Sequence, residues 1–200
     1  LLNNIKNSDE EIRKDIWKRE KNRGNELNNK TIGIIGYGNT GSEFAKILSG
    51  NGIEILTYDK YKTSYPFESS MQKIFEKADI ISFHIPLNTE TFKICNKKFI
   101  QNFSKPIYII NTSRGDCVDT KALVSGLKTK KILGACLDVF EYEKKSFANF
   151  KSTKKYQDME YLKNSRKTIL TPHIAGWTYE SKYKIAKILA KKITNYFKAN

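Results

Sequence analysis

Residues 31–41 read Thr-Ile-Gly-Ile-Ile-Gly-Tyr-Gly-Asn-Thr-Gly, an apolar run that ends in the spacing Gly36-x-Gly38-x-x-Gly41. The next residues, 42–49, have helical periodicity, so the pattern predicts a strand, a tight glycine turn and a helix. In such a unit Gly36 permits the turn, Gly38 lets the backbone approach a pyrophosphate, and Gly41 lets the helix pack on the strand. Because free N–H groups at the helix N-terminus face the anion, the stretch predicts a dinucleotide phosphate site.

A carboxylate after the next strand indicates which dinucleotide binds. Residues 53–58 are apolar and lead into Asp59, 18 residues beyond Gly41. A carboxylate at this point accepts hydrogen bonds from the ribose hydroxyls of NAD and repels the 2′-phosphate of NADP. We therefore predict NAD as the cofactor.

Strand and helix patterns alternate along the rest of the chain. Further strands are predicted at 78–83, 107–110, 132–139 and 168–170, and helices at 9–21, 67–76, 96–102, 120–127 and 179–196. Residues 144–164 are polar and predict a loop with at most one helical turn. The alternation predicts an α/β fold with a doubly wound parallel sheet. We divide the chain into a lead-in helix and linker (1–28) and one Rossmann-type NAD-binding domain (29–200).

The formal net charge of +15 is spread along the chain. Lysines are densest at 144–155 and 182–192, and they are not interleaved with aromatic residues on one evident face. We interpret them as a solvated surface and expect no nucleic-acid partner, with salt-dependent DNA binding as the alternative. No apolar run reaches the length of a membrane span, so we also expect no membrane partner.

The cysteines indicate the redox environment of the protein. Cys95, Cys117 and Cys136 are odd in number and lie in or beside apolar segments. This pattern favours structural thiols in a reducing cytoplasm, and no Cys/His spacing resembles a metal site.

Polar side chains follow the predicted strands, at the sheet edge where ligands of such folds bind. They are Asp59, His84, Asn111 to Arg114, Asp138, Glu143 and His173. An arginine clamps a carboxylate, a histidine moves a hydroxyl proton, and a carboxylate orients the imidazole. These are the groups that hydride transfer between a nicotinamide and a 2-hydroxy acid requires.

Four motifs in this order resemble the NAD-binding domain of the D-isomer-specific 2-hydroxyacid dehydrogenases, a family that includes D-3-phosphoglycerate dehydrogenase. They are Gly-Tyr-Gly-Asn-Thr-Gly at 36–41, Asn-Thr-Ser-Arg-Gly at 111–115, Gly-Ala-Cys-Leu-Asp-Val-Phe-Glu-Tyr-Glu at 134–143 and Thr-Pro-His-Ile-Ala-Gly-Trp at 171–177. The resemblance extends from about residue 17 onward.

The resemblance implies a role for each motif residue. Arg114 would bind substrate, His173 would be the acid/base, and Glu143 would be its partner, with Glu141 as the nearby competitor. His173 would remove the hydroxyl proton while hydride leaves for the nicotinamide, or act in reverse on a keto acid. The cofactor-binding set would be Gly36, Gly38, Asn39, Thr40, Gly41, Asp59, Thr112, Ser113, Arg114, Asp138, His173 and Gly176.

The substrate and the assembly are also expectations from the resemblance. The residues of the motifs at 36–39 and 173–178 are most similar to those of the phosphoglycerate members, so we expect 3-phosphoglycerate or a related 2-hydroxy acid as the substrate. The alternative function is a non-catalytic NAD-sensing interaction protein, similar to the family's corepressor branch. Ile12, Ile16 and Trp17 would form an apolar stripe for a homodimer contact. In this family a substrate-domain segment precedes the cofactor domain; without it, we expect NAD binding with poor turnover.

Overall fold

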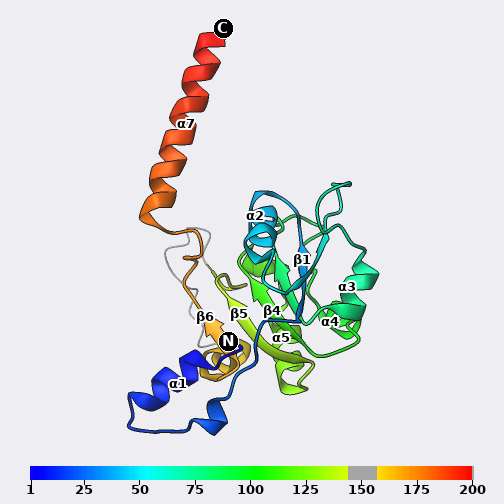
Figure 1. The fold of residues 1–200 in the computed structure, drawn as a ribbon, viewed down its shortest axis with the longest axis vertical. Helices are drawn as coiled ribbons and strands as arrows, with labels where there is room; N and C mark the ends of the chain where they lie inside the picture. The colour runs from blue at the N-terminus through cyan, green and yellow to red at the C-terminus, as the bar shows by residue number, and fades with distance from the viewer. Residues whose placement is uncertain (144–156, 200) are drawn as a thin grey trace.

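Six parallel strands form one sheet with helices on both faces in the computed structural model, which describes residues 1–143 and 157–199 (Figure 1). The strand order is β2-β1-β3-β4-β5-β6, so the direction of winding reverses between β1 and β3. This confirms the predicted α/β, doubly wound Rossmann-type fold. The strands are β1 (Thr31–Ile35), β2 (Glu54–Tyr58), β3 (Ile80–Phe83), β4 (Ile107–Asn111), β5 (Ile132–Leu137) and β6 (Thr168–Leu170).

The described residues form two apolar cores, one on each face of the sheet, because side chains alternate along the strands. In β1, Ile32 and Ile34 pack toward α2, whereas Ile35 belongs to the larger core on the opposite face. That larger core is covered by α3, α4, α5 and α6. The helices are α1 (Ile5–Ile12), α2 (Asn39–Leu48), α3 (Met71–Lys77), α4 (Lys97–Gln101), α5 (Thr120–Lys128), α6 (Gln157–Asn164) and α7 (Tyr179–Ala199).

Helices α2 and α3 begin three and four residues away from their predicted first residues, and local capping explains both shifts. Helix α2 begins at Asn39 and not at residue 42, because the extended backbone of Gly38 is its N-cap and Gly41 lies within the helix. Helix α3 begins at Met71 and not at residue 67, because the Ser70 hydroxyl accepts the Lys73 N–H.

The lead-in segment also differs from the prediction of one helix over residues 9–21. Helix α1 ends at Ile12, and a short 3-10 turn follows at Glu20–Asn22. Contacts with the approach to β6 explain the placement of α1. The buried carboxylate of Glu11 forms an ion pair with Arg166 at 2.8 Å, and the Asn7 amide donates to the Arg166 carbonyl.

The prediction of a loop with at most one turn over residues 144–164 was wrong for its last part. Residues 157–164 form α6, an eight-residue helix, whereas 144–156 lie outside the described residues. Only two of its apolar side chains, Met159 and Leu162, are buried, and they join the core beside α5. Tertiary packing therefore stabilises a helix whose sequence is mainly polar.

Helix α7 has the predicted periodicity, but it extends away from the sheet (Figure 1). The apolar stripe formed by Ile185, Ile188, Leu189 and Ile193 is between 53% and 59% exposed. Among the described helices, none combines the length and apolar composition needed to cross a bilayer.

Candidate functional site

The glycine turn after β1 has the geometry that the sequence predicts. Gly36 has φ +96°, and a Cβ there would collide with the carbonyl group of His84. Gly41 lies against the turn, where a Cβ would be 3.1 Å from the Gly36 carbonyl carbon. No atom lies within 4 Å of the position that a Gly38 Cβ would take. Together with the exposed first turn of α2 at Asn39 and Thr40, this forms an open cradle that suits a pyrophosphate.

Asp59 is tied to the glycine turn by hydrogen bonds. Its Oδ2 accepts the Tyr37 N–H at 2.8 Å, and its Oδ1 accepts the N–H groups of Tyr61 and Lys62. Burial by itself would raise the pKa of the Asp59 carboxyl, but these backbone hydrogen bonds outweigh it and lower the pKa. The group is therefore an ionised acceptor beside the turn, and its Oδ2, which accepts a single N–H, retains one acceptor position that a ribose hydroxyl could use.

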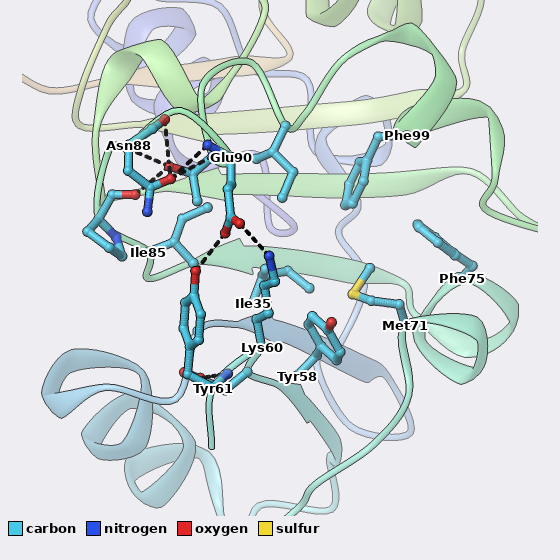
Figure 2. Close-up of a pocket in the computed structure, with 15 residues that line it drawn as sticks. Ile35, Tyr58, Lys60, Tyr61, Met71, Phe75, Ile85, Asn88, Glu90 and Phe99 are labelled. Atoms are coloured by element: carbon cyan, nitrogen blue, oxygen red, sulfur yellow. Dashed lines mark hydrogen bonds and ion pairs between the residues drawn. The ribbon is translucent and has the colours of Figure 1, made fainter. Parts of the chain in front are cut away.

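A cavity of about 380 Å³ lies beside Asp59, between the loops that follow β2 and β3 (Figure 2). Its size is within the usual range of small-molecule sites. The wall is apolar, with Ile35, Tyr58, Met71, Phe75, Ile85, Ile94 and Phe99, and the polar lining residues include Lys60, Tyr61, Asn88 and Glu90. Sequence reasoning missed these polar residues. The available signal was the run Asn-Thr-Glu-Thr at 88–91, which follows the predicted strand 78–83 after four residues.

The loop after β4 carries Arg114 and is organised by a buried amide. The Asn111 side chain donates to the Arg114 carbonyl at 3.0 Å and accepts both the N–H and the hydroxyl of Ser113. The Arg114 guanidinium donates to the Ser113 carbonyl at 2.7 Å, and its side chain is exposed, as is Thr112. An exposed guanidinium on an ordered loop suits the binding of an anion.

Glu143 and His173 meet across the ends of β5 and β6. The Glu143 Oε2 lies 3.0 Å from His173 Nδ1, and the Glu143 Oε1 accepts the Phe140 N–H at 2.5 Å. The carboxylate is thus held by the backbone on one oxygen and orients the imidazole with the other. Nδ1 of the imidazole therefore faces the Glu143 carboxylate, and Nε2 points away from it.

Asp138 holds the His173 loop. Its carboxylate accepts the N–H groups of Ile174 and Ala175 at 2.8 and 2.9 Å and the Thr171 hydroxyl at 2.6 Å. The Asp138 carbonyl also accepts the His173 N–H. His173 has φ +56°, a conformation that side chains seldom adopt, so these bonds maintain an otherwise costly backbone. Gly176, further along the loop, is exposed.

Glu141, the competing carboxylate, has different partners. It forms an ion pair with Lys93 at 2.7 Å and accepts the Thr120 N–H at the start of α5. Burial would raise the pKa of Glu141, but the contacts with Lys93 and Thr120 lower it. The geometry therefore brings Glu143, and not Glu141, to His173.

His84, which the sequence also put at this edge, lies under the glycine turn. Its ring is 2.9 Å from the Ser82 hydroxyl and packs on Phe44. Burial lowers the pKa of His84 to about 4, so it is neutral at physiological pH.

Comparison with known proteins decides the family. Residues 1–175 match the family described as D-isomer specific 2-hydroxyacid dehydrogenase, NAD binding domain. The chain belongs to this family. It is 36% identical to a glyoxylate reductase of Thermofilum pendens, in an alignment that covers 94% of this chain and 56% of that protein. It is 32% identical to a hydroxypyruvate reductase of Thermotoga maritima, over 91% of this chain and 58% of that protein.

A solved relative supports both the fold and the cofactor. The D-lactate dehydrogenase of Aquifex aeolicus, in complex with NAD and lactic acid, superposes with a TM-score of 0.83 at 30% identity. The match covers 100% of this chain and 63% of that one. This member of the family is thus an NAD-binding domain, and it spans little more than half the length of the relatives it matches.

Proposed function

We propose that this domain holds NAD for the interconversion of a D-2-hydroxy acid and its 2-oxo acid. The glycine cradle would bind the pyrophosphate, and Asp59 would bind the adenosine ribose. The loops that carry Thr112, Ser113, Asp138 and Gly176 would surround the nicotinamide. One oxygen of the Asp138 carboxylate accepts a single N–H and so retains an acceptor position for an amide.

When bound, NAD supplies the hydride acceptor, or NADH the donor. The residues of the chain would bind the acid and move its proton. The Arg114 guanidinium would neutralise the substrate carboxylate through paired hydrogen bonds. His173 would take the hydroxyl proton at Nε2, or return it to a keto oxygen, while Glu143 accepts the Nδ1–H and stabilises the imidazolium.

The contact between Glu143 and His173 is the observation that carries this proposal. The two side chains come from loops 30 residues apart in sequence, and their atoms are 3.0 Å apart. A carboxylate that fixes one ring nitrogen leaves the other in a defined orientation for proton transfer. The same sheet edge carries the NAD cradle, so proton and hydride chemistry would occur side by side.

The test measures NADH oxidation at 340 nm with a panel of 2-oxo acids, together with NADH affinity by fluorescence. We expect Glu143→Gln and His173→Gln to lower turnover by about a hundredfold or more while NADH still binds. The matched variant Glu141→Gln should keep most of the turnover per folded molecule. A His173→Gln protein as active as the wild type would refute the proposed chemistry. Poor turnover is already expected of the domain without a substrate-domain segment. NADH binding without reduction of any acid would therefore favour the NAD-sensing alternative only in a protein that includes that segment.

We propose 3-phosphoglycerate, or a similarly small 2-hydroxy acid, as the substrate. The excess of cationic residues, with a formal charge of +15, favours an anionic substrate. The names of the two relatives widen the panel to glyoxylate and hydroxypyruvate. A value of kcat/KM for 3-phosphohydroxypyruvate below that for both of these acids would reject the phosphorylated substrate.

We also propose a homodimer through the segment around α1. Ile12 at the end of α1 is 52% exposed, and Trp17 in the following segment is 82% exposed. Apolar groups of this size are typical of interfaces between subunits. Light scattering should show a dimer that Trp17→Ser weakens, and a wild-type monomer at micromolar concentration would refute this assembly.

A further inference from the structure

Asp59 and the residues next to it favour different cofactors. A carboxylate at the end of the second strand suits the 2′-hydroxyl of NAD, whereas a cation near that point suits the 2′-phosphate of NADP. Asp59 is followed by Lys60 and, two residues later, by Lys62. Residues 59–62 therefore contain one carboxylate that favours NAD and two cationic side chains that favour NADP.

Both lysines are engaged by other groups. The Lys62 Nζ donates to the Tyr37 carbonyl at 2.8 Å, on the glycine turn. The Lys60 Nζ forms an ion pair with the Glu90 Oε1 at 2.5 Å (Figure 2). The Tyr61 hydroxyl donates to the other oxygen of Glu90 at 2.6 Å, so Glu90 bridges two residues of the β2 loop.

Glu90 is itself held in place by the loop that follows β3. The side-chain oxygen of Asn88 accepts the N–H groups of Glu90 and Thr91 at 3.0 and 2.9 Å. The Thr91 hydroxyl donates to the Pro86 carbonyl at 2.6 Å. This compact turn presents the Glu90 carboxylate across the cavity to Lys60. The hydrogen bonds from Lys60 and Tyr61 lower the pKa of Glu90, so the carboxylate is ionised at neutral pH.

We propose that Glu90 is a second determinant of NAD selectivity, because it neutralises Lys60 and holds that cation away from the adenosine ribose. The proposal rests on the NAD site described above, with the adenosine ribose at Asp59. Asp59 would repel the 2′-phosphate directly. Glu90 would act indirectly, because its ion pair with Lys60 keeps the lysine ammonium from binding that phosphate. Selectivity of this kind combines a favourable contact with one partner and a penalty against the other.

The size of the effect follows from the exposure of the pair. The side chains of Lys60 and Glu90 are 55% and 47% exposed, so solvent screens their interaction. We therefore expect Glu90→Gln to raise NADPH affinity by about fivefold, with less than about a twofold change for NADH. The ratio of the two dissociation constants is the quantity that changes.

The experiment is a calorimetric titration of the 200-residue chain with NADH and with NADPH. The variants are Glu90→Gln, Lys60→Met and the double variant Glu90→Gln/Lys60→Met. The double variant should lose the gain in NADPH affinity, because the released lysine is then absent. Glu160→Gln is the matched control, since Glu160 forms an exposed pair with Lys163 in α6, away from the cavity.

Three outcomes would overturn the proposal. An unchanged NADPH/NADH ratio in Glu90→Gln would show that Glu90 has no part in selectivity. A gain that persists in the double variant would exclude Lys60 as its source. Equal weakening of both cofactors would show that the bridge clamps the adenosine instead. In each case NADH binding by the wild type leaves the proposed function intact, whereas a wild type that binds neither cofactor would refute both.

Discussion

The exchange Gly41→Ala tests whether close packing of α2 on the glycine turn keeps the cofactor cradle in shape. A Cβ at Gly41 would lie 3.1 Å from the Gly36 carbonyl carbon and 3.3 Å from the His84 Cβ, and the Gly36 carbonyl oxygen would be nearer still. Because the Gly36 atoms are backbone, they cannot rotate away as a flexible side chain would. The turn or the helix must therefore shift.

Two opposing effects set the magnitude. Overpacking of this kind costs about 1–3 kcal/mol. Alanine in place of glycine within a helix stabilises by at most about 1 kcal/mol. Because the clash is with backbone atoms, we place its cost in the upper part of that range. The resulting net loss of about 1–2 kcal/mol lowers the melting temperature of a domain of this size by about 2–8 °C. A displaced turn should also weaken NADH binding by about tenfold or more, which corresponds to about 1.4 kcal/mol.

Gly38→Ala is the matched control for packing. Gly38 has φ −76°, which alanine adopts, and its added Cβ would meet no atom within 4 Å. Thermal melts without cofactor should therefore show a smaller loss than in Gly41→Ala. NADH affinity, measured by fluorescence titration, should still fall about tenfold, because the added methyl group blocks the backbone from the pyrophosphate. A Gly41→Ala protein with wild-type stability and affinity would refute the packing argument, as would a Gly38→Ala protein that melts lower than Gly41→Ala.

Three further predictions concern stability. The free energy of unfolding should fall as the pH drops from 6.5 toward 4, because burial lowers the pKa of His84 to about 4 and the unfolded chain takes up the proton first; His84→Gln should reduce this slope in thermal melts. Asp138→Asn should cost about 1–3 kcal/mol, since an amide cannot accept all the donors of the His173 loop, and the melting temperature should fall by about 2–12 °C. Glu141→Gln should lower stability by about 1–2 kcal/mol in urea titrations, through loss of the contacts to Lys93 and α5.

Controls separate these three effects from general charge changes. Glu160→Gln removes an exposed carboxylate of α6 and should leave the melting temperature within about 1–2 °C of the wild type. An unchanged pH slope in His84→Gln would contradict the burial argument for that ring. Wild-type stability in Asp138→Asn or Glu141→Gln would show that solvent replaces their hydrogen bonds without cost.

Local patterns in the sequence determined most of the fold. The apolar β-branched runs and the glycine spacing specify β1, the turn and α2, because backbone conformation there depends on residues that are neighbours in sequence. The alternation of strands and helices then predicts a doubly wound parallel sheet, since the right-handed crossover restricts the topology. The same alternation predicts which polar residues lie at the carboxyl edge of the sheet, because they directly follow the strands. Their roles come from the family resemblance.

Tertiary structure decided which of these groups meet. Glu141 and Glu143 are two residues apart, and only the path of the loop after β5 directs one to Lys93 and the other to His173. Helix α6 exists because α5 and β6 offer its few apolar residues a core, which no local pattern records. The bridge from Glu90 to Lys60 joins residues 30 apart in sequence. Such contacts depend on how separate loops pack in space, and the local sequence of each loop does not determine the distance between side chains on different loops.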